Sequence, residues 1–356
     1  MIKILQTTLL FSALILLGCK STQSLQNDKN SDTVSEKQTS SLKQKKSELL
    51  GRTSKAICYS GFRDGQHPDR GDGAVIPSYE EILEDLEILQ ESGFNLIRLY
   101  DSGENSKMVL EVIRDHKLKI KVLLGIWLKA ELSNHENCWW LHEPIPEEML
   151  QLNREQNLLE IERGIDLAKE FKGIVVAISV GNEALVEWND HLMDVDTVIS
   201  YVNYVKKSIK QDVTVADNFK WWAVNGKELA AAVDFISVHV YPLWEGQGIE
   251  NGLEYSIRNL EEVRDSLPDA RMVITEAGWA SIASEFGERA SEENQKKHYE
   301  ELMLWANNMN ITTFWFEAFD ENWKGDPGNM MGAEKHWGIY NADRTPKQVM
   351  KQYHLE

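Results

Sequence analysis

The chain has 356 residues, 42% of them hydrophobic, so it is long enough to bury one large core. Its formal net charge of -19 at pH 7 excludes the basic surface that nucleic acids and anionic membranes require of a partner. An uncharged ligand has no such requirement.

Residues 1–18 have the pattern of an export signal, with a lysine near the start and an apolar run from Leu9 to Leu17. This run is shorter than the roughly 20 residues of a membrane-spanning helix. The small residue before Cys19 resembles a lipobox, so we expect cleavage there and lipidation of the Cys19 thiol. The alternative is an ordinary cleaved signal peptide. Both place the mature protein outside the cytoplasm, and lipidation would anchor it to a membrane of the cell envelope.

Residues 19–49 are rich in Ser, Gln, Lys, Asn, Asp and Thr and nearly free of large apolar side chains. Such a segment cannot bury enough surface to offset its ordering entropy. We therefore predict a disordered, lipid-anchored tether, followed by one catalytic domain over residues 50–356.

Beyond residue 50, strand patterns alternate with helix patterns, which predicts a parallel sheet. Ser78-Tyr-Glu-Glu81 is a capping box that begins one helix, another spans 153–171, and Ser291 caps a third that ends near Met309. Eight strands followed by helices or loops close into a single (β/α)8 TIM barrel of the α/β class. The predicted strands are 56–59, 96–100, 120–125, 174–180, 213–216, 235–240, 272–275 and 312–316.

Two of these strands are followed closely by a glutamate, in Ile178-Ser-Val-Gly-Asn-Glu-Ala184 and Val273-Ile-Thr-Glu-Ala-Gly-Trp279. Catalytic residues of barrel enzymes lie at the carboxyl ends of the strands. Two carboxylates on separate parallel strands are the pair that cleaves a glycosidic bond. The alternative is a helix-capping role for Glu183 and a surface position for Glu276.

With both motifs in view, the sequence resembles glycoside hydrolase family 17, the β-1,3-glucanases and glucanosyltransferases built on (β/α)8 barrels. The resemblance implies a retaining reaction with Glu183 as acid/base on strand four and Glu276 as nucleophile on strand seven. Further matching motifs are Ile57-Cys-Tyr-Ser-Gly-Phe62, Ile97-Arg-Leu-Tyr-Asp101, Val238-His-Val-Tyr-Pro242, Phe316-Glu-Ala-Phe-Asp-Glu-Asn-Trp-Lys324 and Glu334-Lys-His-Trp-Gly338.

The same motifs supply candidate substrate-binding residues. The resemblance implies that Glu321, Lys324 and Glu334 form a charged cluster near the cleft and that Tyr241 lies close to the nucleophile. Asn182 is placed to bond the sugar 2-hydroxyl, a contact that strengthens in the transition state. Tyr100, from the second-strand motif, completes this polar set.

Ten of the twelve tryptophans fall at or after a predicted strand end. Aromatic faces can stack on pyranose rings, and we expect Trp279 and Trp337, next to motif residues, to form sugar subsites, followed by Trp139 and Trp140. The alternative is that the loops bury these indoles for stability.

Two departures from the family bear on the reaction. Plant members commonly read Asn-Glu-Pro where this chain has Asn182-Glu-Ala184, and the run from Phe316 looks closer to the fungal and bacterial branch, which includes transferases. The leading hypothesis is hydrolysis of a laminarin-like β-1,3-glucan. Glucan transfer, or non-catalytic glycan binding at the cell surface, is the alternative.

The remaining patterns predict no metal or other cofactor. His135 to His142 matches no standard zinc spacing, and Asp64 to Gly73 lacks EF-hand spacing. Cys58 and Cys138 form no disulfide framework, so we expect free thiols in a monomer. The longest irregular insertion, residues 128–152, is predicted to lie on the catalytic face.

Overall fold

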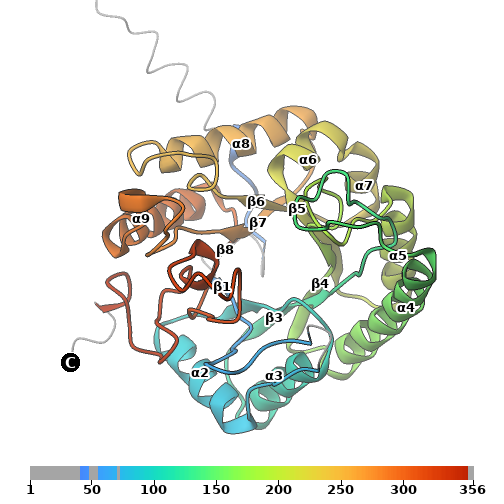
Figure 1. Cartoon of the computed structure of the whole chain (residues 1–356), viewed down its shortest axis with the longest axis horizontal. Coiled ribbons are helices and arrows are strands. Elements are labelled where there is room, and N and C mark those ends of the chain that lie inside the picture. The colour runs from blue at the N-terminus through green and yellow to red at the C-terminus, as the bar shows by residue number, and fades with distance from the viewer. Residues whose placement is uncertain (1–40, 48–54, 70–72, 352–356) are drawn as a thin grey trace, which may run out of the picture.

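The computed structural model describes residues 41–47, 55–69 and 73–351. The predicted signal peptide (1–18), Cys19 and most of the predicted tether lie outside these residues. Within them, eight parallel strands form a closed barrel in the order β1 to β8, because β8 pairs with β1 (Figure 1). The strands are β1 (Ala56–Cys58), β2 (Leu96–Arg98), β3 (Lys121–Ile126), β4 (Val175–Asn182), β5 (Asp212–Asn218), β6 (Ile236–Val240), β7 (Met272–Ala277) and β8 (Thr313–Trp315).

The predicted (β/α)8 fold is confirmed, and all eight strands lie where the sequence predicts them. Helices surround the barrel in Figure 1. They are α2 (Tyr79–Glu91), α3 (Glu104–Asp115), α4 (Glu147–Glu170), α5 (Val195–Ser208), α6 (Phe219–Asn225), α7 (Lys227–Ala232), α8 (Gly252–Ser266) and α9 (Glu292–Met309), with short 3-10 turns at Gly287–Arg289 and Ala333–Lys335.

Two predicted helix caps are confirmed. The Ser78 hydroxyl accepts from the amide of Glu81, whose carboxylate accepts from the amide of Ser78, so α2 begins with a complete capping box. Ser291 caps α9 in the same way by accepting from the amide of Asn294, and that helix ends at Met309.

The predicted bounds of the insertion after β3 are wrong. Helix α4 begins at Glu147, so residues 147–152 are helical and the irregular segment is shorter than 128–152. The start was readable from Pro146, which precedes the first helical residue, and from the acidic Glu147 and Glu148, which complement the helix dipole.

Four strand pairings shift register, and three of these shifts lie at the carboxyl end of the barrel. They fall between Ser179 and Asn182, between Val238 and His239, and between Ile274 and Ala277. Such irregularities re-aim side chains and are common beside active sites. Here they accompany both motif glutamates.

The prediction of a disordered tether is wrong for residues 41–47. Leu42 is fully buried in the core, and Gln44 exchanges two side-chain hydrogen bonds of 2.7 Å with the backbone of Met272, the first residue of β7. The backbone carbonyl of Gln44 also accepts from Asn310 at 2.7 Å. This segment therefore packs against the end of the barrel opposite Glu276. The burial of one leucine is enough to order it, although most of its other residues are polar.

We expect Leu42→Ala to destabilise the domain by about 2 to 4 kcal/mol, because the substitution removes a fully buried leucine from the core. Chemical denaturation of the mature domain would measure the free energy of unfolding. Lys43→Ala is the adjacent control and should change it little. An unchanged free energy in Leu42→Ala would contradict the docking of this segment.

Within the part of the chain that the structure describes, no helix combines the length and apolar character needed to cross a membrane. Cys58 and Cys138 are separate buried thiols, and the Cys58 Sγ donates to the carbonyl of Thr275 at 3.3 Å.

Candidate active site

Glu276, near the end of β7, is held by hydrogen bonds to both carboxylate oxygens. Its Oε1 accepts from Arg98 Nη1 at 2.6 Å and from the Tyr100 hydroxyl at 3.0 Å. Its Oε2 accepts from the Tyr241 hydroxyl at 2.6 Å. Strands β2, β6 and β7 thus aim one carboxylate, and the sequence-predicted residues Tyr100 and Tyr241 both contact it.

The charge of Glu276 is stabilised although the side chain is buried. Burial by itself raises the pKa of this carboxyl, but His239 and Arg98, together with the two tyrosine hydroxyls, hold the pKa below its ordinary value. An ionised carboxylate with a fixed orientation is what a nucleophile requires.

Glu183 follows β4 and adopts a left-handed backbone conformation, with φ of 47°. This conformation is unfavourable for residues with a side chain, and such strained residues cluster at active sites and ligand-binding loops. The surrounding loop holds it in place. The Glu183 amide donates to the Ala216 carbonyl at 2.8 Å, and its own carbonyl accepts from the side chain of Asn189.

Asp217, near the end of β5, contacts the same loop. It is fully buried, and its carboxylate accepts from the amide of Leu185 at 3.0 Å. Burial, followed by the nearby charge of Glu183, raises the pKa of Asp217 well above its ordinary value. Its backbone contact fixes the loop two residues after Glu183.

His239, on β6, bridges the two glutamates. Its Nε2 lies 3.3 Å from Arg98 Nη1, which can only donate, so the tautomer that accepts this hydrogen bond carries its hydrogen on Nδ1. That Nδ1 lies 2.9 Å from Glu183 Oε1 and 3.4 Å from Glu276 Oε2. One acceptor oxygen of Glu183 lies within 4.8 Å of one from Glu276.

The spacing between the carboxylates of Glu183 and Glu276 bears on whether a glycosidase would retain or invert the configuration of the sugar. Retaining glycosidases hold their two carboxyl groups about 5 to 5.5 Å apart, whereas inverting enzymes separate them by about 6.5 to 9.5 Å to admit a water. A cation held by Glu183, His239 and Glu276 is a poorer interpretation, since the Arg98 guanidinium already contacts Glu276.

Asn182 lies beside the acid/base candidate and is also oriented by Arg98. Its Oδ1 accepts from Arg98 Nη2 at 2.5 Å. With the oxygen fixed, the amide NH2 group is left to donate, as a contact to a sugar hydroxyl requires.

Glu321 does not have the position predicted for a substrate-binding residue. It is 1% exposed, and its oxygens accept from the Ser60 hydroxyl at 2.7 Å and the Phe62 amide at 3.0 Å. It also pairs with Lys324 at 2.9 Å, and Glu317 contacts the same ammonium. Glu321 is therefore a buried counter-ion that holds Lys324 in place.

Lys324 and Glu334 remain candidates for contact with substrate. Burial lowers the pKa of Lys324, but Glu317 and Glu321 outweigh it, so this ammonium stays charged. Burial raises the pKa of Glu334, Lys324 opposes that rise, and the charges of Glu183 and Glu276 add to it. Glu334 therefore lies in the field of both glutamates, as expected of a residue near the cleft.

The predictions for Trp279 and Trp337 as stacking surfaces are wrong. Trp279 is 0% and Trp337 1% exposed, so neither ring presents a face to a sugar. The Trp279 indole donates to the Arg289 carbonyl at 2.8 Å, and Trp337 packs edge-on against Tyr241 with ring centroids 5.3 Å apart. The structural alternative holds for both, because adjacency to a motif residue does not set the direction of a side chain.

Sequence reasoning missed Arg98, His239 and Asp217 as functional residues. Each is a charged or titratable side chain within a strand and at most 1% exposed, and the strands of Arg98 and His239 are otherwise largely apolar. Such residues are rarely buried unless they are paired. That mismatch was the available signal, but the sequence does not show which partners would neutralise them.

A closed eight-stranded barrel with a carboxylate pair at the carboxyl ends of β4 and β7 defines a glycoside hydrolase. Comparison with known sequences identifies the family: residues 56–338 match the BtgE/BtgC glycoside hydrolase domain. The chain belongs to that family, and it is an enzyme.

Several relatives resemble most of the chain. Glucan 1,3-beta-glucosidase of Arthroderma benhamiae is 26% identical over 80% of this chain and 85% of its own length. The putative glucan endo-1,3-beta-glucosidase btgC of Aspergillus niger is 26% identical over 77% of this chain, which spans only 40% of that protein.

Solved structures agree with the fold. An endo-laminarinase from Formosa Hel1_33_131 is 26% identical and superposes with a TM-score of 0.75, covering 85% of this chain and 87% of that one. A β-1,3-glucanosyltransferase of Rhizomucor miehei, 20% identical, superposes with a TM-score of 0.62 over 83% of this chain and 96% of that one, and shows the fold alone.

Proposed function

We propose that the protein is a retaining glycosidase that hydrolyses a laminarin-like β-1,3-glucan by double displacement. The observation that carries the proposal is the close pair of Glu183 and Glu276, with His239 between them. The relatives named as glucan 1,3-beta-glucosidases and the similar endo-laminarinase support the β-1,3-glucan substrate.

In the first step, Glu276 attacks the anomeric carbon while Glu183 protonates the departing oxygen. The Arg98, Tyr100 and Tyr241 contacts keep the attacking carboxylate oriented toward the sugar. His239 contacts Oε1 of Glu183. The Oε2 atom of Glu183 has no hydrogen-bond partner among the described residues, so it is available to carry the transferred proton.

In the second step, Glu183 acts as a base toward water, which releases the sugar from Glu276 with retained configuration. Esterification of Glu276 removes one negative charge from the site, which favours this change of role. The Asn182 amide is placed to bond the sugar 2-hydroxyl in both transition states.

Hydrolysis of laminarin followed by NMR tests this proposal. We expect new reducing ends of the β-anomer to appear first, before mutarotation, and the products to shorten over time. Initial release of the α-anomer would exclude the retaining mechanism. Products longer than the starting oligosaccharide would assign the enzyme to glucan transfer, and binding without any product would assign it to glycan recognition.

We also propose that Cys19 anchors the enzyme in the cell envelope. The lipobox-like residues before Cys19 and the polar segment after it support this proposal.

Cys19→Ser should release the protein from membranes or leave it unprocessed, since the lipidated thiol is lost. Membrane fractionation and mass spectrometry of the mature N-terminus would measure this, with Cys138→Ser as a control that should remain membrane-bound. Wild-type protein that is freely soluble and carries no lipid mass would contradict the proposal.

A further inference from the structure

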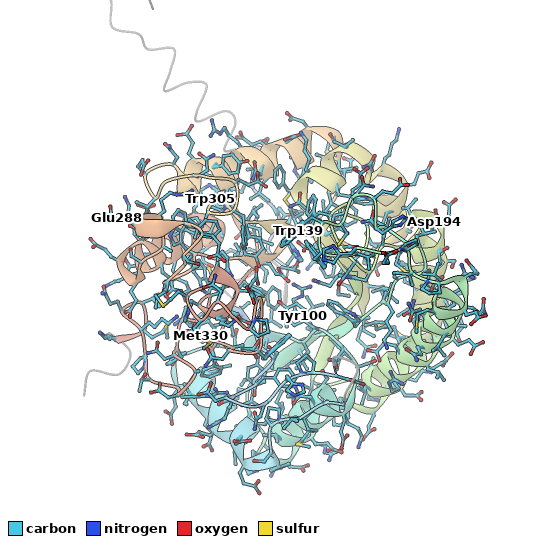
Figure 2. The ribbon with its side chains drawn as sticks, viewed as in Figure 1. Tyr100, Trp139, Asp194, Glu288, Trp305 and Met330 are labelled. Carbon is cyan, nitrogen blue, oxygen red and sulfur yellow. The ribbon has the colours of Figure 1, made fainter. Side chains whose placement is uncertain are left out.

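Two adjacent indoles stand exposed on the loop after β3. Trp139 is 80% exposed, the highest value for a large hydrophobic residue in the described chain, and Trp140 is 42% exposed. Their rings meet edge to face with centroids 5.3 Å apart. Single exposed apolar residues are ordinary, but clustered aromatics mark a surface that binds a partner. Figure 2 shows Trp139 at the end of the barrel that faces the viewer, where Tyr100 also lies.

The loop that carries these indoles is tied to the loop after β4. Trp140 Nε1 donates to Asp190 Oδ2 at 3.2 Å, so one ring has a fixed orientation. The amide of Asn134 donates to the carbonyls of Glu187 and Asn189, on either side of Trp188. Trp188 is itself 46% exposed, which adds a third indole to the same pair of loops.

A chain of side-chain contacts links this surface to the catalytic residues. The other carboxylate oxygen of Asp190 lies 2.9 Å from His191 Nδ1, and His191 Nε2 lies 2.9 Å from the carbonyl of Asn182. The His191 ring also stacks on Trp127, with centroids 4.8 Å apart. Since Asn182 directly precedes Glu183, the exposed indoles are positioned relative to the acid/base.

The connection to Glu183 indicates on which side of the scissile bond the exposed indoles lie. An acid that protonates the departing oxygen lies beside the leaving sugar, whereas the nucleophile lies beneath the ring that becomes attached to it. The loops of Trp140 and Trp188 are tied to the Glu183 loop. Glu276 is held from β2 and β6 instead. The indoles therefore belong to the leaving-group side.

We propose that Trp139, Trp140 and Trp188 form an aromatic platform on which the leaving-group-side glucosyl units of a β-1,3-glucan stack. The inference rests on the proposed function, because the substrate is a glucan chain only if that proposal holds. Indole faces match the apolar face of a pyranose ring, and the edge-to-face angle of 87° between Trp139 and Trp140 suits a curved chain better than a flat one.

Two matched substrates test the platform. Laminari-oligosaccharides place sugars on both sides of the scissile bond, whereas nitrophenyl laminari-oligosaccharides cleaved at the aryl group place only nitrophenol on the leaving-group side. We expect Trp139→Ala and Trp140→Ala to lower kcat/KM about tenfold on the natural oligosaccharides, on the scale of other aromatic stacking platforms. Nitrophenol release should be unchanged.

Tyr204→Ala is the matched control, because Tyr204 is an exposed aromatic on α5 whose hydroxyl contacts Glu162 on the outer helices. It should leave both substrates unaffected. Equal losses on both substrates in Trp139→Ala would place the platform on the other side of the cleft and overturn the proposal. No loss on either substrate would overturn it as well, as would a dimer at assay concentration that Trp139→Ala dissociates.

Failure of the proposed function gives a different result. Wild-type protein that is inactive on both substrates would contradict glucan hydrolysis. Retardation of the protein in native gels that contain laminarin would then test whether the three indoles bind a glycan. Retardation that Trp139→Ala weakens and Tyr204→Ala does not would still support a glycan-binding surface. Retardation equal in all three proteins would overturn it.

Discussion

Glu276→Ala should lose turnover on every glycoside, whereas Glu183→Ala should lose about 10²- to 10⁴-fold on laminarin and little on a dinitrophenyl glycoside. The first variant cannot form the covalent intermediate. The second keeps its nucleophile and lacks only the proton donor, which a dinitrophenolate leaving group does not need. Steady-state kinetics on the two substrates would measure the difference.

Added azide separates the two roles by stereochemistry. In Glu183→Ala it should intercept the α-linked glycosyl-enzyme and give a β-glycosyl azide. In Glu276→Ala it should occupy the vacated space and give the α product from an activated β-glycoside. Glu187→Ala, which removes an exposed carboxylate from the same loop as Glu183, is the control and should form neither azide. The opposite pair of configurations would reverse the assigned roles.

The barrel was predictable because its signals are local. Apolar runs of strand length alternate with amphipathic helices, and capping residues such as Ser78 and Ser291 mark where helices begin. The glutamates were predictable too, since each ends a buried strand. Local patterns therefore supplied the strands, two helix starts and the positions of both carboxylates.

The environment of the carboxylates was not predictable, because it depends on contacts between residues distant in sequence. Arg98 meets Glu276 across 178 positions, and His239 meets Glu183 across 56. The directions of side chains could not be predicted for the same reason. Trp279 and Glu321 are buried in the protein, whereas Trp139 is exposed. Composition also misled at Leu42, because a single buried side chain does not change the average of a polar segment.

Arg98→Met should destabilise the protein by about 3 to 5 kcal/mol at neutral pH, because it leaves Glu276 buried without its main hydrogen-bonded cation. The same change should slow catalysis, since the nucleophile loses one orienting donor and Asn182 loses another. Denaturation curves and kcat/KM as functions of pH would measure both effects. Arg114→Met, which breaks only surface ion pairs with Asp115 and Glu170, is the control and should change neither.

The pH dependence distinguishes the loss of this ion pair from simple damage to packing. The pKa of Glu276 lies below its ordinary value, so the ionised carboxylate contributes stability above that ordinary value, about 4.3, and loses it as pH falls through the lowered pKa. Without Arg98, one of the groups that lower the pKa of Glu276 is lost, so this pKa rises. Glu276 then takes up a proton at higher pH, which removes the unpaired charge. The destabilisation should therefore be largest near pH 7 and smaller near pH 4, and the acidic limb of the kcat/KM profile should move to higher pH. A loss of stability that is constant across this range, with an unmoved acidic limb, would show that Arg98 acts through packing alone.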